Sequence, residues 1–277
     1  MIAKIRHCAL WSDGCARSAR FYKTIFGMKQ FTSAQPGGEF PNQGDGQPNR
    51  PRGQISDGVI GFALNPKPPG FRSGLDHFGF QLQDVDTVVS RIKQHYPDTI
   101  LTSGLEGVSF VAMRVHDPVG THIDIAQAGG GNLRDGYSKG ENWEGPRHLH
   151  HIAIRARQPA LLAEFYQKVF ELIEVKELSS DKGICLTDGK SYLLIRPCDN
   201  NYYRSMSQGL DHIGFKVESI EAVKKELDEI GKAFPESAPR KINIGRNGPF
   251  IQRDMDDCPL GQYAISDPEG VLIDLAA

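Results

Sequence analysis

The sequence contains two nearly identical heptapeptides, GLDHFGF at residues 74–80 and GLDHIGF at residues 209–215. Six of the seven positions match, and the two copies begin 135 residues apart. Internal repeats are considered before other patterns because an overlooked repeat leads to the wrong architecture. The two heptapeptides therefore indicate that one structural unit occurs twice in this chain of 277 residues.

Other landmarks recur around the heptapeptides in the same order. In each copy a His precedes a Phe-Tyr pair by fourteen residues, and an Asp-Pro pair leads to a second Asp seven residues later. These residues are His7, Phe21-Tyr22, Asp117-Pro118 and Asp124 in the first copy, and His151, Phe165-Tyr166, Asp267-Pro268 and Asp274 in the second. The pattern predicts a tandem duplication, with modules at 1–127 and 147–277. The Gly-rich polar stretch 128–146 is expected to be the linker.

Residue periodicity predicts the same elements in both modules. A strand carrying the first His precedes a helix, and Gly27 suits the end of that helix in the first module. Short strands, the heptapeptide strand, a second helix and the strands ending at the final Asp follow, so each module reads β-α-β-β-β twice, an α+β fold. Residues 33–58 are too polar and Gly/Pro-rich to pack. They are expected to be a disordered insertion, and the functional alternative is a lid. Residues 234–258 have apolar residues that could anchor a lid.

Composition excludes several classes of function. Lys plus Arg total 32 and Asp plus Glu total 34, so the charge gives no reason to expect a nucleic acid or membrane partner. No apolar run approaches the roughly 18 residues of a membrane helix, and the N-terminus lacks signal-peptide features. Five cysteines without a CxxC pair do not make a disulfide scaffold. We therefore expect a cytoplasmic protein that acts on a small molecule.

Each module places two His and one Asp on predicted strands. The two sets are His7, His77 and Asp124 in the first module, and His151, His212 and Asp274 in the second. Two imidazoles and one carboxylate with open coordination positions suit Fe(II) and related divalent metals. A single His on a strand is usually structural, but this set occurs twice in register, which favours a metal in at least one module.

Strand alternation predicts the neighbours of these side chains. On the first strand of each module, Ile5 and Ala9 are expected to share a face with His7, and Leu149 and Ala153 with His151. On the heptapeptide strands, Gly79 is expected beside His77 and Gly214 beside His212. On the last strands, His122 is expected beside Asp124 and Leu272 beside Asp274. The two glycines are expected to leave room for a substrate. His122 would add an imidazole to the first site, and the second site would be drier.

Together these motifs resemble the vicinal oxygen chelate superfamily. The resemblance rests on the first-strand His, the Phe-Tyr pair, DHxGF, and DPxG with an acid six residues after the Pro. It covers nearly all of both modules. It implies paired βαβββ units that curl into an open, barrel-like sheet around a metal. Members include glyoxalase I, extradiol dioxygenases, methylmalonyl-CoA epimerase, fosfomycin-resistance enzymes and bleomycin-binding proteins, so the fold alone does not fix the reaction.

The resemblance also bears on the choice among these chemistries. Glyoxalase-like and epimerase-like members have an additional acidic or amide metal ligand on the last strand of the first βαβββ unit. The candidate strands here are VIGFALN (59–65) and SYLLIR (191–196), and neither has such a residue in mid-strand. Three ligands and two tandem modules favour an extradiol dioxygenase, in which the C-terminal module holds the metal. The chain departs from that pattern by its Asp ligands, its short C-terminal end and Ala264 at the position of a Tyr acid, with Tyr263 one residue away.

The resulting hypothesis is a divalent-metal-dependent enzyme whose small oxygenated or aromatic substrate chelates the metal through two adjacent oxygens. Extradiol-type ring cleavage is favoured over a glyoxalase-like lyase or isomerase and over a non-catalytic small-molecule or drug-binding protein. Fe(II) is the favoured metal, with Mn(II), Zn(II) and Ni(II) as alternatives.

The metal site of the second module is favoured, with Tyr192, Arg196 and Tyr263 as candidate catalytic residues. An Arg there would suit an anionic substrate. The cysteines of that module are expected to be buried and structural, and a homo-oligomer is left open.

Overall fold

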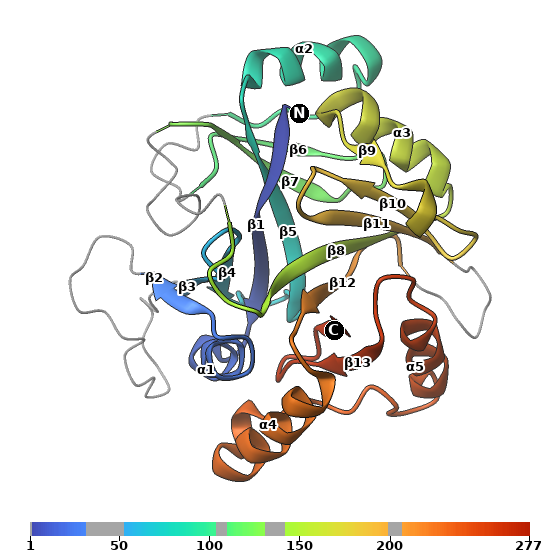
Figure 1. Cartoon of the computed structure of the whole chain (residues 1–277). Coiled ribbons are helices and arrows are strands. Elements are labelled where there is room, and N and C mark those ends of the chain that lie inside the picture. Colours follow the sequence, from blue (N-terminus) through green and yellow to red (C-terminus); the bar gives the residue numbers. More distant parts are fainter. Residues whose placement is uncertain (1, 32–52, 104–109, 131–141, 199–206) are drawn as a thin grey trace.

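The computed structural model describes residues 2–31, 53–103, 110–130, 142–198 and 207–277 (Figure 1). Its strands form two seven-stranded mixed sheets, β2-β3-β4-β1-β5-β7-β6 and β13-β14-β12-β8-β11-β10-β9. The first sheet contains β1 (Ala3–Ser12), β2 (Lys29–Phe31), β3 (Gly53–Ser56), β4 (Gly61–Pro66), β5 (Gly74–Leu82), β6 (Met113–His116) and β7 (His122–Gln127). The second contains β8 (His148–Ala156), β9 (Ile173–Glu174), β10 (Ile184–Thr187), β11 (Tyr192–Pro197), β12 (Gly209–Lys216), β13 (Tyr263–Ser266) and β14 (Leu272–Ala276).

Among the described residues, two α-helices occupy equivalent places in each module, and the second module has one more. The described α-helices are α1 (Cys15–Phe26), α2 (Val85–His95), α3 (Pro159–Phe170), α4 (Ile220–Ala233) and α5 (Gly248–Asp256). Two short 3-10 helices, η1 (Lys176–Leu178) and η2 (Pro235–Ser237), complete the described elements. Helix α1 ends at Gly27, whose φ of 64° is left-handed, as the sequence predicted.

The strand order confirms two tandem α+β modules. In each sheet the first strand is central: β1 pairs antiparallel with β5 and parallel with β4, and β8 pairs likewise with β12 and β11. Neither sheet closes into a barrel. Two segments predicted to be loops contain regular elements. Strand β3 lies within 33–58, whose residues 33–52 are outside the described residues, and α5 lies within 234–258.

A single hydrophobic core joins the two modules. The ring of Phe26 stacks on that of Phe215 with centroids 3.7 Å apart, and Phe80 stacks on Phe170 at 4.4 Å. Each pair joins one residue from each module, and all four side chains are at most 2% exposed. Helix α1 accordingly lies against α4, and α2 against α3. The two sheets therefore turn their apolar faces toward each other and share one interior.

Buried hydrogen bonds cross this interface in equivalent pairs. The Tyr22 hydroxyl donates to Asp267 Oδ2 at 3.0 Å, and the Tyr166 hydroxyl donates to Asp117 Oδ2 at 2.7 Å. The backbone N–H of Ile5 donates to Asp188 at 2.6 Å, and the N–H of Leu149 donates to Asp57 at 2.9 Å. The Phe-Tyr motif of each module thus meets the Asp-Pro motif of the other.

Four β-bulges shift the alternation of side chains along the central strands. The register places one extra residue in β1 and β8, at Arg6 and His150, and one in β5 and β12, at Asp76 and Asp211. Because a one-residue shift moves a side chain to the other face, Ile5 and Leu149 join the shared core instead of lying beside His7 and His151. The expected grouping of these residues was wrong for this reason.

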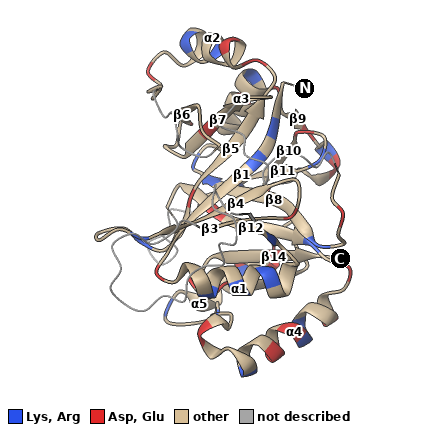
Figure 2. Cartoon of the chain, turned by 90° about the vertical axis from the view of Figure 1, so that its left-hand side faces the viewer, with Lys and Arg blue, Asp and Glu red and all other residues tan. Residues whose placement is uncertain are grey.

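Figure 2 shows Lys and Arg intermixed with Asp and Glu along α4. Among the described residues, no helix is long and apolar enough to cross a membrane.

Candidate metal centre

Three strands of the second module bring His151, His212 and Asp274 together. His151 lies on β8, His212 on β12 and Asp274 on β14, all on the face turned away from the shared core. The two Nε2 atoms are 3.2 Å apart, and Asp274 Oδ2 is 3.2 Å from His212 Nε2 and 3.7 Å from His151 Nε2. Each side chain is at most 1% exposed. Two imidazole nitrogens and one carboxylate oxygen therefore converge on one point.

The Asp274 carboxylate shows that this cluster fits a cation. No hydrogen bond to either of its oxygens is present, and its nearest polar neighbours are the Nε2 atoms of His212 and His151, 3.2 and 3.7 Å from Oδ2. Burial opposes the ionised form of Asp274, but the neighbouring imidazoles outweigh this effect and lower the pKa of the carboxyl group. A buried carboxylate without donors is costly unless a cation neutralises it, and a divalent metal between the three ligand atoms would do so.

Glycines make room for the ligands rather than for a substrate. A Cβ atom on Gly214 would lie 1.9 Å from the His151 ring, and one on Gly261 would lie 2.4 Å from Asp274 Cγ. The ring and the carboxylate therefore lie directly over these two glycines. The expected substrate space beside His212 is filled by His151, so this part of the prediction was wrong.

The β-bulge at Asp211 orients the second imidazole. Asp211 Oδ2 lies 2.7 Å from His212 Nδ1, which leaves Nε2 directed at the cluster. Metal-binding His residues commonly donate their other ring N–H to such a carboxylate. Burial opposes the charged imidazolium, but Asp211 and Asp274 outweigh burial and raise the pKa of His212. On a regular strand Asp211 would point to the opposite face, so alternation alone could not assign this role.

Cys258 joins the same cluster from outside the sheet. It follows α5, is 5% exposed, and places Sγ 3.6 Å from His212 Nε2. One potential ligand atom from each of His151, His212, Cys258 and Asp274 lies within 4.8 Å of the others. Burial opposes ionisation of the Cys258 thiol, but interactions with His151 and His212 outweigh it and lower the thiol pKa. The expectation of a purely structural cysteine missed this contact because no sequence spacing links Cys258 to the His residues.

Ion pairs fix α5 over the centre. Asp254 on α5 pairs with Arg155 and with Arg196, whose Nη1 lies 3.2 Å from Asp254 Oδ2. Arg155 Nε also donates to Asp211 Oδ1 at 2.8 Å, and Asp211 in turn contacts the His212 ring. Met255 on the same helix is 1% exposed. Residues 248–256 of the segment that the sequence identified as a lid candidate therefore form a helix that ion pairs join to β8 and β11.

The first module assembles the corresponding residues around an arginine. His7 and His77 approach through Nε2 atoms 3.1 Å apart, and His77 Nε2 lies 3.1 Å from Asp124 Oδ2. Arg114 donates from Nε to Asp124 Oδ1 at 2.6 Å and from Nη2 to Oδ2 at 3.1 Å. Its Nη2 also lies 3.4 Å from His77 Nε2. In the arrangement observed, the Arg114 guanidinium group therefore neutralises the Asp124 carboxylate.

Aromatic packing closes the first site further. The Phe110 ring stacks on His7 with centroids 4.7 Å apart and occupies the space over Gly79, where a Cβ would lie 2.6 Å from Phe110. Burial and the neighbouring His77 lower the pKa of His7 to about 3, so His7 is neutral. The expected extra imidazole of His122 is absent from this cluster, because His122 is exposed and Arg114 takes its place.

The three candidate catalytic residues lie at different places. Tyr192 pairs with His151 across β11 and β8 and packs in the small apolar cluster that contains Cys258. Arg196 is 2% exposed and bound to Asp254, which occupies the position expected for an anionic substrate. Tyr263 is 36% exposed and packs against the Lys224 ammonium group, whereas Ala264 pairs with Asp274. The structure therefore does not bring Tyr263 to the centre.

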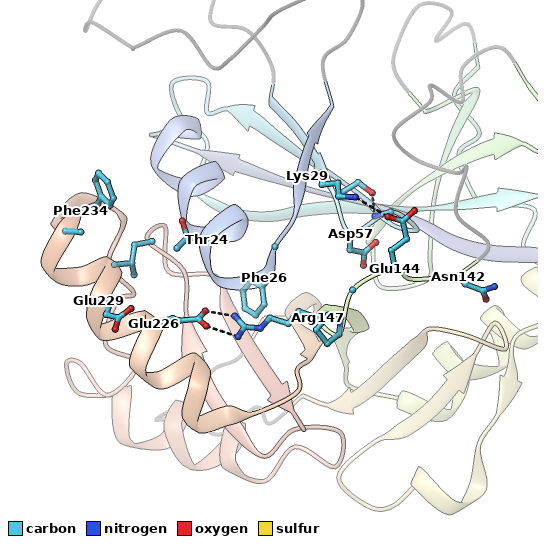
Figure 3. Close-up of a pocket in the computed structure, with 17 residues that line it drawn as sticks. Thr24, Phe26, Lys29, Asp57, Asn142, Glu144, Arg147, Glu226, Glu229 and Phe234 are labelled. Carbon is cyan, nitrogen blue, oxygen red and sulfur yellow. Dashed lines mark hydrogen bonds and ion pairs between the residues drawn. The ribbon is translucent and has the colours of Figure 1, made fainter.

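A surface cleft lies apart from both clusters. Its volume is about 970 Å³, and it lies between α1, α4 and the segment that ends at Arg147 (Figure 3). Arg147 forms ion pairs with Glu226 and Glu218 at its wall, and Phe26 and Phe234 supply apolar surface. None of the candidate ligands lines this cleft.

Comparisons with known proteins agree with this architecture. The family model for the Glyoxalase/Bleomycin resistance protein/Dioxygenase superfamily matches residues 4–135. A comparison with curated proteins gives no match.

Among solved structures, the chain is similar to an extradiol ring-cleaving dioxygenase from B. fuscum, with 12% identity, a TM-score of 0.61 and coverage of 100% of this chain and 72% of that one. It is similar to the Mn(II)-bound glyoxalase from Novosphingobium aromaticivorans, with 12% identity, a TM-score of 0.59 and coverage of 99% and 81%. A xylose isomerase-like TIM barrel/4-hydroxyphenylpyruvate dioxygenase fusion protein matches with 16% identity and a TM-score of 0.54. That match covers 87% of this chain but only 40% of the fusion protein.

Identities this low show a common fold and leave the reaction open. The first module therefore matches the Glyoxalase/Bleomycin resistance protein/Dioxygenase superfamily over residues 4–135, and the second module repeats its motifs and strand order.

Proposed function

We propose that this protein is a divalent-metal-dependent enzyme whose metal is held in the second module by His151, His212 and Asp274. The observation that carries the proposal is the buried Asp274 carboxylate, which has no hydrogen-bond donor and faces two imidazole nitrogens. When bound, the metal would act as a Lewis acid and as a template for two adjacent oxygens of a small substrate. Asp211 holds the His212 ring in the orientation that this role requires.

Extradiol-type ring cleavage of an aromatic diol is the favoured reaction, with Fe(II) as the favoured metal. Two His and one carboxylate form the ligand set suited to iron-dependent oxygen chemistry. The middle of β11 supports this choice, because Leu193, Leu194 and Ile195 offer no fourth acidic ligand. Tyr192 is the polar side chain of β11 nearest to His151, and it would contact the substrate rather than the metal.

A glyoxalase-like lyase or isomerase is the second candidate, and Cys258 is the observation that favours it. A thiol beside the three ligands provides a fourth donor, which suits redox-inactive Lewis-acid chemistry with Zn(II) better than binding of both a diol and oxygen. Mn(II) and Ni(II) remain alternatives for this reaction. A non-catalytic binding protein would instead hold no stoichiometric metal.

Metal analysis of the full-length protein tests the proposal first. We expect about one equivalent of a transition metal in the wild type, its loss in His212→Ala, and its retention in His77→Ala, the matched variant of the first module. Oxygen uptake with a panel of catechols, using protein loaded with Fe(II) without oxygen, then separates the two reactions. Retention of metal in His212→Ala would refute the proposed centre, and turnover without oxygen uptake would favour the lyase or isomerase.

A further inference from the structure

Cys258 is placed at the metal centre by two independent constraints. Helix α5, which ends two residues before it, is held by the ion pairs of Asp254 with Arg155 and Arg196. The turn that follows places Gly261 against the Asp274 carboxylate, where a side chain could not fit. The Cys258 side chain is therefore enclosed between a fixed helix and a ligand, and it is 5% exposed.

The distances around Cys258 match those of a tetrahedral site. Zn–S bonds of about 2.3 Å and Zn–N bonds of about 2.0–2.1 Å place sulfur and nitrogen about 3.5 Å apart at the tetrahedral angle. The distance from Cys258 Sγ to His212 Nε2 is 3.6 Å. Two nitrogens on one tetrahedral metal lie about 3.3 Å apart by the same geometry, and the two Nε2 atoms here are 3.2 Å apart.

The unpartnered carboxylate beside the thiol is the second observation that points to a ligand. Asp274 is 1% exposed and has no hydrogen-bond donor on either oxygen. If Cys258 only filled space, the buried carboxylate would face two imidazoles and a thiol with no cation between them. If a cation lies between the four side chains, all four donor atoms are directed at it.

We propose that Cys258 is a fourth metal ligand, so that the resting centre is a closed site of two His, one Asp and one Cys. The inference rests on the proposed metal centre of the second module and adds its resting coordination. A site with four protein ligands has no open position, whereas catalytic sites keep one. The oxygens of a substrate therefore reach the metal only when Cys258 leaves it, which requires movement of α5 and its turn. In the part of the first module that the structure describes, Phe110 and Arg114 lie at the corresponding cluster.

Cobalt substitution of the full-length protein tests the proposal without an activity assay. Co(II) bound through a thiolate gives a sulfur-to-cobalt charge-transfer absorption in the near ultraviolet. We expect this absorption in the wild type, its loss in Cys258→Ala and its retention in Cys185→Ala. Cys185 is the matched control because it is fully buried and packs in the same small apolar cluster as Cys258. We also expect Cys258→Ala to bind Co(II) at least about tenfold more weakly, as loss of a group at a metal site commonly does.

A second measurement needs no variant. Native wild-type protein is treated with an alkylating reagent with and without Co(II), and the modified cysteines are identified by mass spectrometry. Protection of Cys258 by the metal supports ligation. Co(II) bound to the wild type without the absorption, or without protection of Cys258, overturns the role of Cys258 and leaves the three-ligand centre intact. Failure of Co(II) binding to depend on His212 would instead refute the centre itself.

Discussion

Replacement of Tyr166 by Phe tests how the two modules are joined. The hydroxyl of Tyr166, on α3 of the second module, donates to Asp117 Oδ2 of the first module at 2.7 Å. Both residues are fully buried. Phe retains the ring, which packs among Phe78, Phe80 and Phe170. The substitution therefore removes one hydrogen bond and almost no apolar contact.

The cost of this substitution follows from what Asp117 retains. Asp117 Oδ1 still accepts from the backbone N–H groups of Val119 and Thr121, but Oδ2 loses the hydroxyl donor. A hydrogen bond to a charged group contributes about 1.5–3 kcal/mol. Unfolding entropies of about 2.1 cal/mol/K per residue convert this loss into a decrease of about 3–5 °C in Tm for a chain of 277 residues.

Urea and thermal unfolding followed by circular dichroism measure this effect. Tyr22→Phe removes the equivalent bond to Asp267 and should lose a similar free energy of unfolding. Tyr96→Phe is the control, because its partly buried ring packs on Phe165 and it should change stability by less than about 0.5 kcal/mol. Since one core joins both modules, each variant should unfold in a single transition. A Tyr166→Phe protein as stable as Tyr96→Phe, or a melt in which only half of the signal shifts, would refute the reasoning.

Three further predictions concern the metal, pH and the core. A transition metal at 100 times its Kd should raise the free energy of unfolding of the wild type by about 2.7 kcal/mol. Thermal melts should show that Asp274→Asn loses this stabilisation by the metal and that Asp124→Asn retains it. Burial raises the pKa of Asp267 to about 6, against an ordinary value of 3.8. The folded state therefore binds the proton more tightly, and this contribution to stability is lost as pH rises from about 4 to about 6. Urea titrations of Asp267→Asn should show the variant gaining about 3 kcal/mol relative to the wild type over that range, and a constant difference would contradict the assignment. Phe215→Ala should cost about 3–5 kcal/mol in the same urea assay, since the side chain is fully buried and stacked on Phe26.

The sequence identified the repeat, the module order and the residues that form the metal-capable clusters. These features depend on local periodicity and on equal spacing in two copies, which a linear pattern records directly. It did not identify Arg114, Phe110 or Cys258, because each reaches its cluster from another strand or helix at a separation that follows no fixed spacing.

The β-bulges mark a second limit of sequence reasoning. On a regular strand Asp211 would lie on the face opposite His212, whereas the extra residue in β12 directs its carboxylate to the imidazole. Tyr263 would lie beside the ligands only if a bulge occurred in its strand. The register between β13 and β14 is regular, so Tyr263 points away from them. A bulge depends on pairing between strands, so a single strand's sequence does not reveal it.

What the sequence by itself determined is a duplicated α+β module with two sets of two His and one Asp. What only the tertiary structure decided is how those copies differ and how they are joined. Arg114 neutralises Asp124 in one copy, whereas neither oxygen of Asp274 accepts a hydrogen bond in the other. The Phe-Tyr and Asp-Pro motifs, which looked like landmarks within each module, form their hydrogen bonds across the interface. The physical reason is that charge neutralisation and buried hydrogen bonding depend on which groups meet in space, and no spacing along the chain specifies those partners.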